Sequence, residues 1–152
     1  MGYVKEFKKV EDKFAEVIKQ FGDTSKSTKE EDIHEHWDVK LDIKFDVKAI
    51  KKTNRYDNEP NENIHWVELK NVRGNKGWLY GDANYFAFET EDYWIIVEKL
   101  SLQNLIADKC KEKLKTTRPE LYKLYQRENR EDMVTLVKTI DLCSIAEKIL
   151  KK

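Results

Sequence analysis

The sequence predicts a single domain of the α+β class, in which helices pack against a β-sheet. Apolar residues recur every three or four positions over residues 3–21, which is the period of an amphipathic helix. They alternate with charged residues over 37–49, as in a half-buried strand, and two short apolar runs at 85–88 and 93–97 are typical of strands inside a sheet. The 152 residues are enough for one domain and too few for two ordinary ones.

The composition is that of a globular protein with a highly charged surface. Hydrophobic residues make up 39% of the chain and charged residues 38%, so disorder is not expected. The 29 Lys and Arg balance the 29 Asp and Glu, so attraction to a polyanion has to come from local clusters and not from net charge. The chain has no signal-like apolar start and no apolar run of about 18 residues, which predicts a cytoplasmic protein without membrane contact.

The first third of the chain predicts one helix, one loop and one long strand. The helix over 3–21 should close near Gly22, and the polar residues 23–31 have no period, which is typical of a surface loop. As a single strand, residues 37–49 would extend about 43 Å, which is long for a globular protein. We therefore expect a bend or hairpin near 42–44, with an odd-length loop or a bulge that preserves the alternation.

The middle of the chain reads as strands separated by turns. Residues 51–63 are rich in Asn, Asp and Glu and predict a connecting loop. A strand should follow over 65–72, then a glycine-punctuated turn over 73–78. Two further strands are expected at 85–88 and 93–97, the second buried on both faces.

The last third predicts a helix, a hairpin and a final helix. Ser101 can cap a helix whose apolar positions extend as far as Leu114. The apolar runs 121–125 and 133–137 flank a polar turn, which predicts a β-hairpin. The last helix should begin at about Asp141.

The tripeptide Glu68-Leu69-Lys70 is the strongest chemical signal. A strand sends alternate side chains to opposite faces, so Glu68 and Lys70 should project together while Leu69 enters the core. A carboxylate beside an ammonium suits metal-dependent phosphodiester hydrolysis, because the acid can hold the cation while the amine orients the attacking water. A second carboxylate is needed at the same point, and Asp46 in the preceding strand offers one.

The order of these elements resembles that of the PD-(D/E)XK nuclease superfamily, which includes restriction endonucleases and Holliday junction resolvases. The chain has one helix, then strands with Asp46 and Glu68-x-Lys70, then a glycine turn, further strands and a helix. The resemblance covers roughly residues 3–110. It implies a restriction-endonuclease-like core with a mixed central sheet flanked by helices, to which the hairpin and helix of residues 118–152 would be an addition. The chain resembles a small phage-type member, which would act in the host cytoplasm.

The resemblance assigns a role to each residue of the motif. It implies that Asp46, Glu68 and the backbone carbonyl of Leu69 hold Mg²⁺ or Mn²⁺, and that Lys70 positions the water. Phe45 stands where the family has the proline that names the motif.

Two choices among acidic residues stay open. Many relatives add a glutamate from the first helix; Glu11 lies beside the apolar face and is the first candidate, with Glu6 as the alternate. Asp46 shares its strand face with Asp38 and Asp42, and only the resemblance singles it out.

Two segments could bind nucleic acid. Residues 109–130 contain eight basic side chains against three acidic ones, with tyrosines between them, and residues 73–78 form a glycine-flanked basic loop. A solvated surface accounts for the first segment equally well, and core packing suits the tryptophan of the second. The expected nucleic-acid-binding residues are Arg73, Lys76, Trp78, Arg118, Lys123, Arg127 and Arg130.

The sequence therefore predicts a metal-dependent nuclease that hydrolyses DNA phosphodiester bonds. The alternatives are a non-catalytic nucleic-acid- or protein-binding module on the same fold, and an α+β structural protein whose charges only solvate it. The expected partner is DNA. By analogy with resolvases and many restriction enzymes, a homodimer is also compatible with this function.

Overall fold

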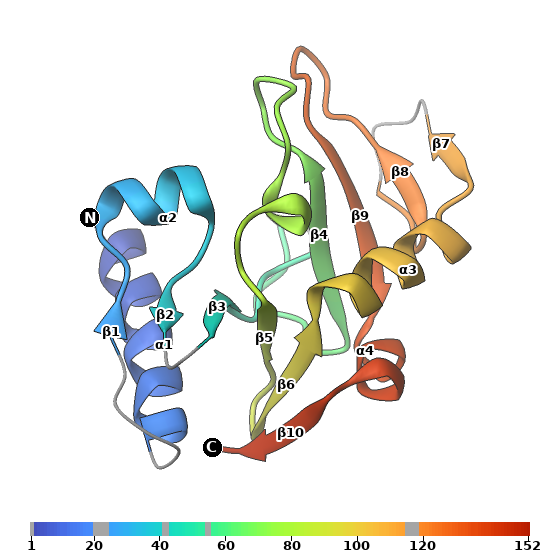
Figure 1. Cartoon of the computed structure of the whole chain (residues 1–152). Helices are drawn as coiled ribbons and strands as arrows, with labels where there is room; N and C mark the ends of the chain where they lie inside the picture. The colour runs from blue at the N-terminus through green and yellow to red at the C-terminus, as the bar shows by residue number, and fades with distance from the viewer. Residues whose placement is uncertain (1, 20–24, 41–42, 54–55, 115–118) are drawn as a thin grey trace.

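A computed structural model describes residues 2–19, 25–40, 43–53, 56–114 and 119–152, with only the backbone described for 2–8 and 112–114. It confirms the predicted α+β fold: helices cover two β-sheets (Figure 1). Within these ranges, no helix combines the length and the apolar character needed to span a membrane.

The larger sheet, sheet A, is mixed and contains strands from both ends of the chain. Its order is β1-β2-β3-β5-β6-β10, and only β3 and β5 are parallel to each other. Its strands are β1 (Ser25–Lys26), β2 (Val39–Lys40), β3 (Lys44–Lys48), β5 (Tyr85–Glu89), β6 (Tyr93–Glu98) and β10 (Lys148–Lys151). The long strand predicted over 37–49 is thus β2 and β3, which pair as an antiparallel hairpin; its expected bend falls partly on residues 41–42, outside the described residues.

The smaller sheet, sheet B, contains the strand that carries Glu68. Its order is β4-β9-β8-β7, formed by β4 (Ile64–Lys70), β9 (Met133–Lys138), β8 (Lys123–Tyr125) and β7 (Glu112–Leu114). The predicted C-terminal hairpin exists as β8 and β9, but β9 pairs along the whole of β4. The hairpin is therefore integrated into a second sheet, while β10 completes the edge of sheet A.

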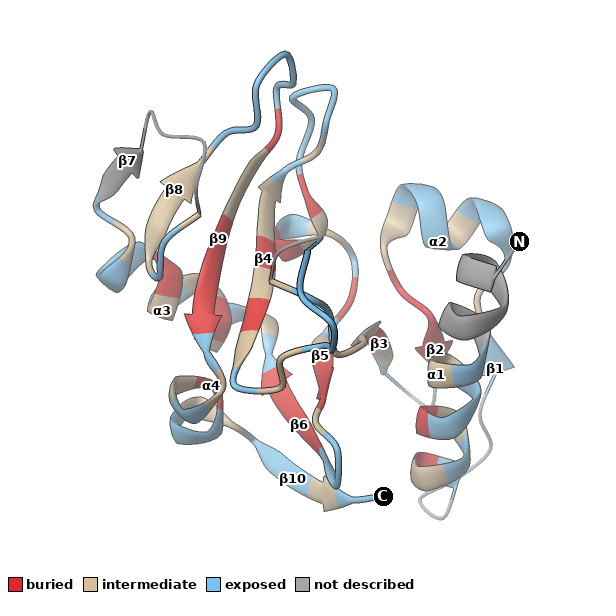
Figure 2. Ribbon diagram, turned by 180° about the vertical axis from the view of Figure 1, so that it is seen from behind, coloured by how far each residue is buried: buried red, intermediate tan, exposed pale blue. Residues whose placement is uncertain are grey.

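Helix α1 (Gly2–Ile18) covers the β1–β3 end of sheet A, as both ribbon views show (Figures 1 and 2). Its helical period places Phe14 and Ile18 on one side, where both are buried. The Phe14 ring packs edge-on against Phe45 and against Trp94, with 5.2 Å between ring centroids in each case. This packing fixes α1 against β3 and β6.

The main core lies between the two sheets. Phe86 and Phe88 of β5 pack there with Val67 of β4, and all three are fully buried. Leu102 of α3 (Lys99–Lys109) and Leu142 of α4 (Thr139–Ile145) complete it. Strand β6 is buried along its four central residues, as predicted, because sheet A is covered on both faces (Figure 2).

Several local predictions were wrong. Helix α2 (Lys29–Glu35) lies in part of the segment expected to be a loop, and begins with a capping box between Thr28 and Glu31. Helix α3 begins at Lys99, so Ser101 lies inside it and does not cap it, and Leu114 belongs to β7. The strand β10 was not anticipated.

Candidate active site

The hairpin of β2 and β3 brings two buried aspartates together. The strands pair through Val39↔Phe45 and Lys40↔Lys44, and Asp38, just before β2, donates a backbone hydrogen bond of 2.6 Å to the carbonyl of Phe45, the neighbour of Asp46. Both aspartates are 5% exposed. Asp38 Oδ2 accepts a hydrogen bond of 2.7 Å from the backbone N–H of Val47, which holds its carboxyl beside that of Asp46.

A third carboxyl reaches this point from α1. Glu11 lies one turn before the buried Phe14, so the packing of α1 brings it to the hairpin. Its side chain forms a hydrogen bond with that of Asp38, and Lys26 Nζ lies 3.9 Å from its Oε2. Asp32 of α2 adds its negative charge to the surroundings of Glu11, Asp38 and Asp46.

Burial disfavours the ionised form of all three acids, and repulsion by a neighbouring carboxylate of the cluster adds to this for Glu11 and Asp38. Burial, and then the neighbouring Asp38, raise the pKa of Glu11 to about 7. Burial, and then the charge of Asp46, raise the pKa of Asp38 to about 8. The pKa of Asp46 is also raised, chiefly by burial. At neutral pH the cluster therefore retains protons, and a bound cation could replace them.

A lysine completes the cluster. Lys48 Nζ lies 2.8 Å from Asp46 Oδ1, because positions 46 and 48 of β3 point to the same side of the sheet. The other oxygen, Asp46 Oδ2, is buried and receives no hydrogen bond from the described residues. Lys48 Nζ also lies 4.1 Å from the centre of the Trp78 ring.

The donor set suits a hard divalent cation. Carboxylate oxygens are the ligands that Mg²⁺ prefers, and one or two of them suffice when water and a phosphate supply the rest. No three His, Cys, Asp or Glu side chains in the described ranges are already arranged to hold an ion. The buried, unpartnered Asp46 Oδ2 is nevertheless the kind of oxygen that a cation would satisfy, so the residues fit the metal.

Glu68 and Lys70 lie in the other sheet. A β-bulge separates them in β4, so the simple alternation that would project them together is broken; Lys70 is exposed and pairs with Met133. Glu68 Oε1 accepts a hydrogen bond of 3.4 Å from the N–H of Trp78. The Leu69 carbonyl, expected to bind metal, accepts one of 2.9 Å from Gly77 N. The charges of Asp46 and Glu68 both act on Lys51, so the two acids share this neighbour.

The basic loop after β4 is exposed, except for its tryptophan. Arg73 and Lys76 are exposed to solvent around Gly74, whose φ of 80° permits the tight turn. Trp78 instead packs against Phe86, with 5.0 Å between ring centroids. Two of the three predicted contacts from this loop are therefore accessible to a ligand.

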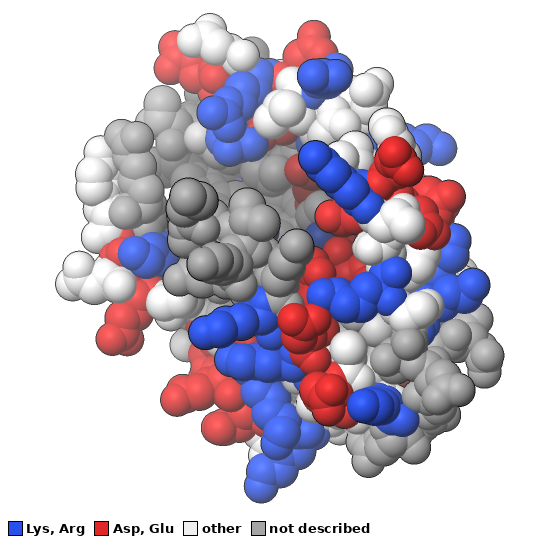
Figure 3. Space-filling model, turned by 90° about the vertical axis from the view of Figure 1, so that its left-hand side faces the viewer, with Lys and Arg blue, Asp and Glu red and all other residues white. Residues whose placement is uncertain are grey.

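The second predicted basic segment contains residues with different roles. Arg127 binds the fully buried Asp132, at 2.5 Å from both Nε and Nη2 to Oδ2. Lys123 is half-buried in β8, Arg130 is exposed, and Arg118 lies outside the described residues. On the face formed by α1 and α2, basic and acidic side chains intermingle (Figure 3).

Of the sequence predictions, Asp46 and Glu11 belong to the carboxyl cluster, while Glu68 and Lys70 lie in sheet B on either side of a bulge. The alternate Glu6 has no described side chain, and Asp42 lies outside the described residues. Lys48 was not assigned a role, although Asp46-Val47-Lys48 has the same acid-x-Lys spacing as Glu68-Leu69-Lys70. That spacing, with Asp38 on the same strand parity, is the signal that could have found it.

Comparisons with protein-family models, with curated proteins and with solved structures found no match to this chain. The function of the cluster has to be inferred from its own geometry and chemistry.

Proposed function

We propose that the chain is a metal-dependent nuclease that hydrolyses DNA phosphodiester bonds at the cluster of Glu11, Asp38, Asp46 and Lys48. The observation that carries this proposal is the meeting of three carboxyls from α1, from the residue before β2, and from β3, with an ammonium bonded to one of them. Acids that only solvate a surface do not gather in a buried site with raised pKa values.

The residue types also support the proposal. The PD-(D/E)XK pattern asks for an acid, then an acid-x-Lys, with a glutamate from the first helix. Asp38, Asp46-Val47-Lys48 and Glu11 supply that set within one contiguous cluster. In this assignment Asp46 moves from the first acid of the pattern to the second, and Trp37 takes the place of the proline.

Each residue would have a separate task. Asp38 and Asp46 would hold Mg²⁺ or Mn²⁺ with help from Glu11; when bound, the metal would activate water and stabilise negative charge on the phosphate. Lys48 would orient the attacking water or neutralise the phosphate, since its ammonium already lies beside Asp46. The hydrogen bond from Val47 N to Asp38 would keep that carboxyl in place.

A cleavage assay with matched variants tests the proposal. Wild-type protein with Mg²⁺ or Mn²⁺ should cleave at least one of a panel of duplex, single-stranded and branched DNAs. Asp46→Asn and Lys48→Gln should lower the rate at least about 100-fold, because each removes a group that acts on the reacting atoms. Glu68→Gln and Lys70→Gln, in the neighbouring sheet, should change it less than about threefold.

The opposite pattern would contradict the new assignment. If Glu68→Gln and Lys70→Gln abolish cleavage while Lys48→Gln retains it, the active site is the one first expected from β4. Binding of DNA without cleavage by the wild type would instead favour the non-catalytic module. Mg²⁺ should also raise the melting temperature of the wild type and not that of Asp46→Asn, which checks the metal site independently of turnover.

A further inference from the structure

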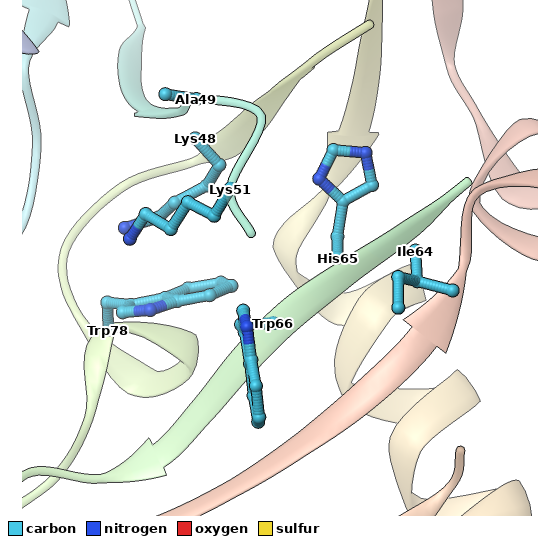
Figure 4. Close-up of a pocket in the computed structure, with 7 residues that line it drawn as sticks. All are labelled: Lys48, Ala49, Lys51, Ile64, His65, Trp66 and Trp78. Atoms are coloured by element: carbon cyan, nitrogen blue, oxygen red, sulfur yellow. The ribbon is translucent and has the colours of Figure 1, made fainter. Parts of the chain in front are cut away.

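A small pocket adjoins the carboxyl cluster through Lys48. It is lined by Lys48, Lys51, His65, Trp66 and Trp78, with Ala49 and Ile64 (Figure 4). Its volume is about 30 Å³, which is room for one or two water-sized groups and not for a nucleobase. The pocket can therefore receive an oxygen of a larger ligand that lies at its mouth.

Two ammonium groups converge at one end of this pocket. Figure 4 shows Lys48 and Lys51 extending towards the same point above the Trp78 ring, and the charge of Lys48 acts directly on Lys51. Burial, and then Lys48, lower the pKa of Lys51, whereas Asp46 and Glu68 raise it. An anion between the two lysines would relieve this repulsion.

His65 provides a polar atom at the other side. Its ring rises from β4 on the side of the Lys48–Lys51 loop, while Trp66 points the opposite way (Figure 4). The residue is 4% exposed, and Nε2 is buried without a hydrogen-bond partner among the described residues. Burial and the charge of Lys51 lower its pKa to about 4, so the ring is neutral at pH 7. Figure 4 shows Nδ1 on the side of the ring that faces the two lysines, so the ring can donate one hydrogen bond towards them from Nδ1 in the matching tautomer.

We propose that Lys48, Lys51 and His65 form a phosphate-binding subsite, which receives an oxygen of a substrate phosphate and holds that phosphate against the carboxyl cluster. This inference rests on the proposed nuclease function for the identity of its ligand. Two sources share the chemistry: an internal phosphodiester next to the cleaved bond, and a terminal phosphate. Lys51 and His65 are binding residues in this scheme, and the reacting atoms stay with Asp46 and Lys48.

Nuclear magnetic resonance of the histidine side chains tests the subsite without any cleavage. Inorganic phosphate is titrated into the full chain at pH 7.5, with sodium chloride keeping the ionic strength constant. The His65 ring signals, assigned with His65→Gln, should shift saturably, while those of His34 and His36 at α2 stay as internal references. Lys51→Gln should weaken binding at least about tenfold, because a charged hydrogen bond is lost, and Lys51→Arg should restore most of it.

Lys52→Gln is the matched control, since Lys52 is the neighbour of Lys51 in the chain and does not line the pocket, and it should bind phosphate like the wild type. Equal shifts at all three histidines, no shift at His65, or unchanged binding by Lys51→Gln would each overturn the subsite. With the non-cleaving Asp46→Asn protein, preference for a 5′-phosphorylated over a 5′-hydroxyl oligonucleotide assigns the subsite to a terminal phosphate, and equal binding assigns it to an internal one.

The two proposals can fail separately. If phosphate binds at His65 but the protein cleaves none of the DNAs, the subsite is supported and the nuclease proposal is refuted. If the protein cleaves DNA but the His65 ring signals do not shift with phosphate, the nuclease proposal is supported and the subsite is refuted.

Discussion

At the scale of single residues, the site depends on how three acids share one buried position. Asp38 and Asp46 are neighbours because Asp38 bonds to the backbone carbonyl before Asp46 and to the backbone N–H after it, and Glu11 arrives on a helix fixed by Phe14. Burying like charges opposes folding, because each ionised carboxyl loses water and repels the next. Stability is thus reduced at the positions that can hold a cation.

The first prediction concerns the pH dependence of stability. A folded-state pKa above the unfolded value means that the folded chain binds more protons, so the stabilisation from protonated Asp38 and Glu11 is complete below about pH 4 and is lost as the pH rises through 7 to 8. Without divalent cations, Asp38→Asn should raise the free energy of unfolding at pH 8 by roughly 1–3 kcal/mol and change it little at pH 4.

Urea unfolding at pH 4, 6 and 8 measures this effect. The matched control is Asp12→Asn, which removes an exposed acid of α1 that pairs with Lys26 of β1, and it should leave the pH dependence as in the wild type. An Asp38→Asn protein that loses stability between pH 4 and 8 as steeply as the wild type would show that Asp38 does not retain its proton on folding.

At the scale of elements, α2 explains why a helix can escape detection. The helix buries no residue of its own, so it has no apolar period, and only the capping box of Thr28 and Glu31 identifies it in the sequence. The helix contributes a side-chain hydrogen bond: Glu35 Oε2 accepts a hydrogen bond of 2.9 Å from Trp37 Nε1. That bond lies next to Asp38 and links α2 to the start of the hairpin.

The loop between β8 and β9 separates structural from binding arginines. Arg127 contacts the buried Asp132 through its guanidinium and its backbone N–H, whereas the exposed Arg130 contributes backbone groups, with its N–H bonded to the Arg127 carbonyl. From the sequence pattern we predicted the same role for both, because a buried acid five positions from an arginine leaves no periodic signal.

The second prediction follows from that difference. Arg127→Ala should lower the free energy of unfolding by on the order of 2 kcal/mol, because it strands a buried carboxylate; the half-exposed arginine keeps the loss below that of a fully buried pair. Arg130→Ala should change it by less than about 0.5 kcal/mol. Urea unfolding at pH 7 measures both, and equal losses from the two variants would refute a structural role specific to Arg127.

At the scale of the whole molecule, zero net charge confines any DNA contact to local groups. Of the basic residues considered, Lys48 and Lys51 lie at the pocket and Arg73 and Lys76 in the exposed loop, while Arg127 is held by Asp132. On the described part of the α1–α2 face, acidic side chains lie beside the basic ones (Figure 3). We therefore expect the chain to contact only a short stretch of DNA.

The third prediction is a shallow salt dependence of DNA binding. Contacts from about four basic side chains give a slope near −4 when the logarithm of the binding constant is plotted against that of the salt concentration, at about −0.9 per phosphate neutralised. Fluorescence anisotropy with labelled duplex and the Asp46→Asn protein measures it. A slope steeper than about −8 would mean that a wider surface, such as the segment 109–130, joins the interface.

The sequence by itself determined the α+β class, the helix α1, the hairpin of β2 and β3 and the doubly buried β6, because each depends on a local period of apolar residues. It also supplied Asp46 and Glu11. Only the tertiary structure decided which groups join them: the hydrogen bond from Val47 N holds Asp38 beside Asp46, and β4 pairs with β9 in a second sheet, where a bulge separates Glu68 from Lys70. Strand partners are chosen by contacts between residues far apart in the chain, and no local pattern records that choice.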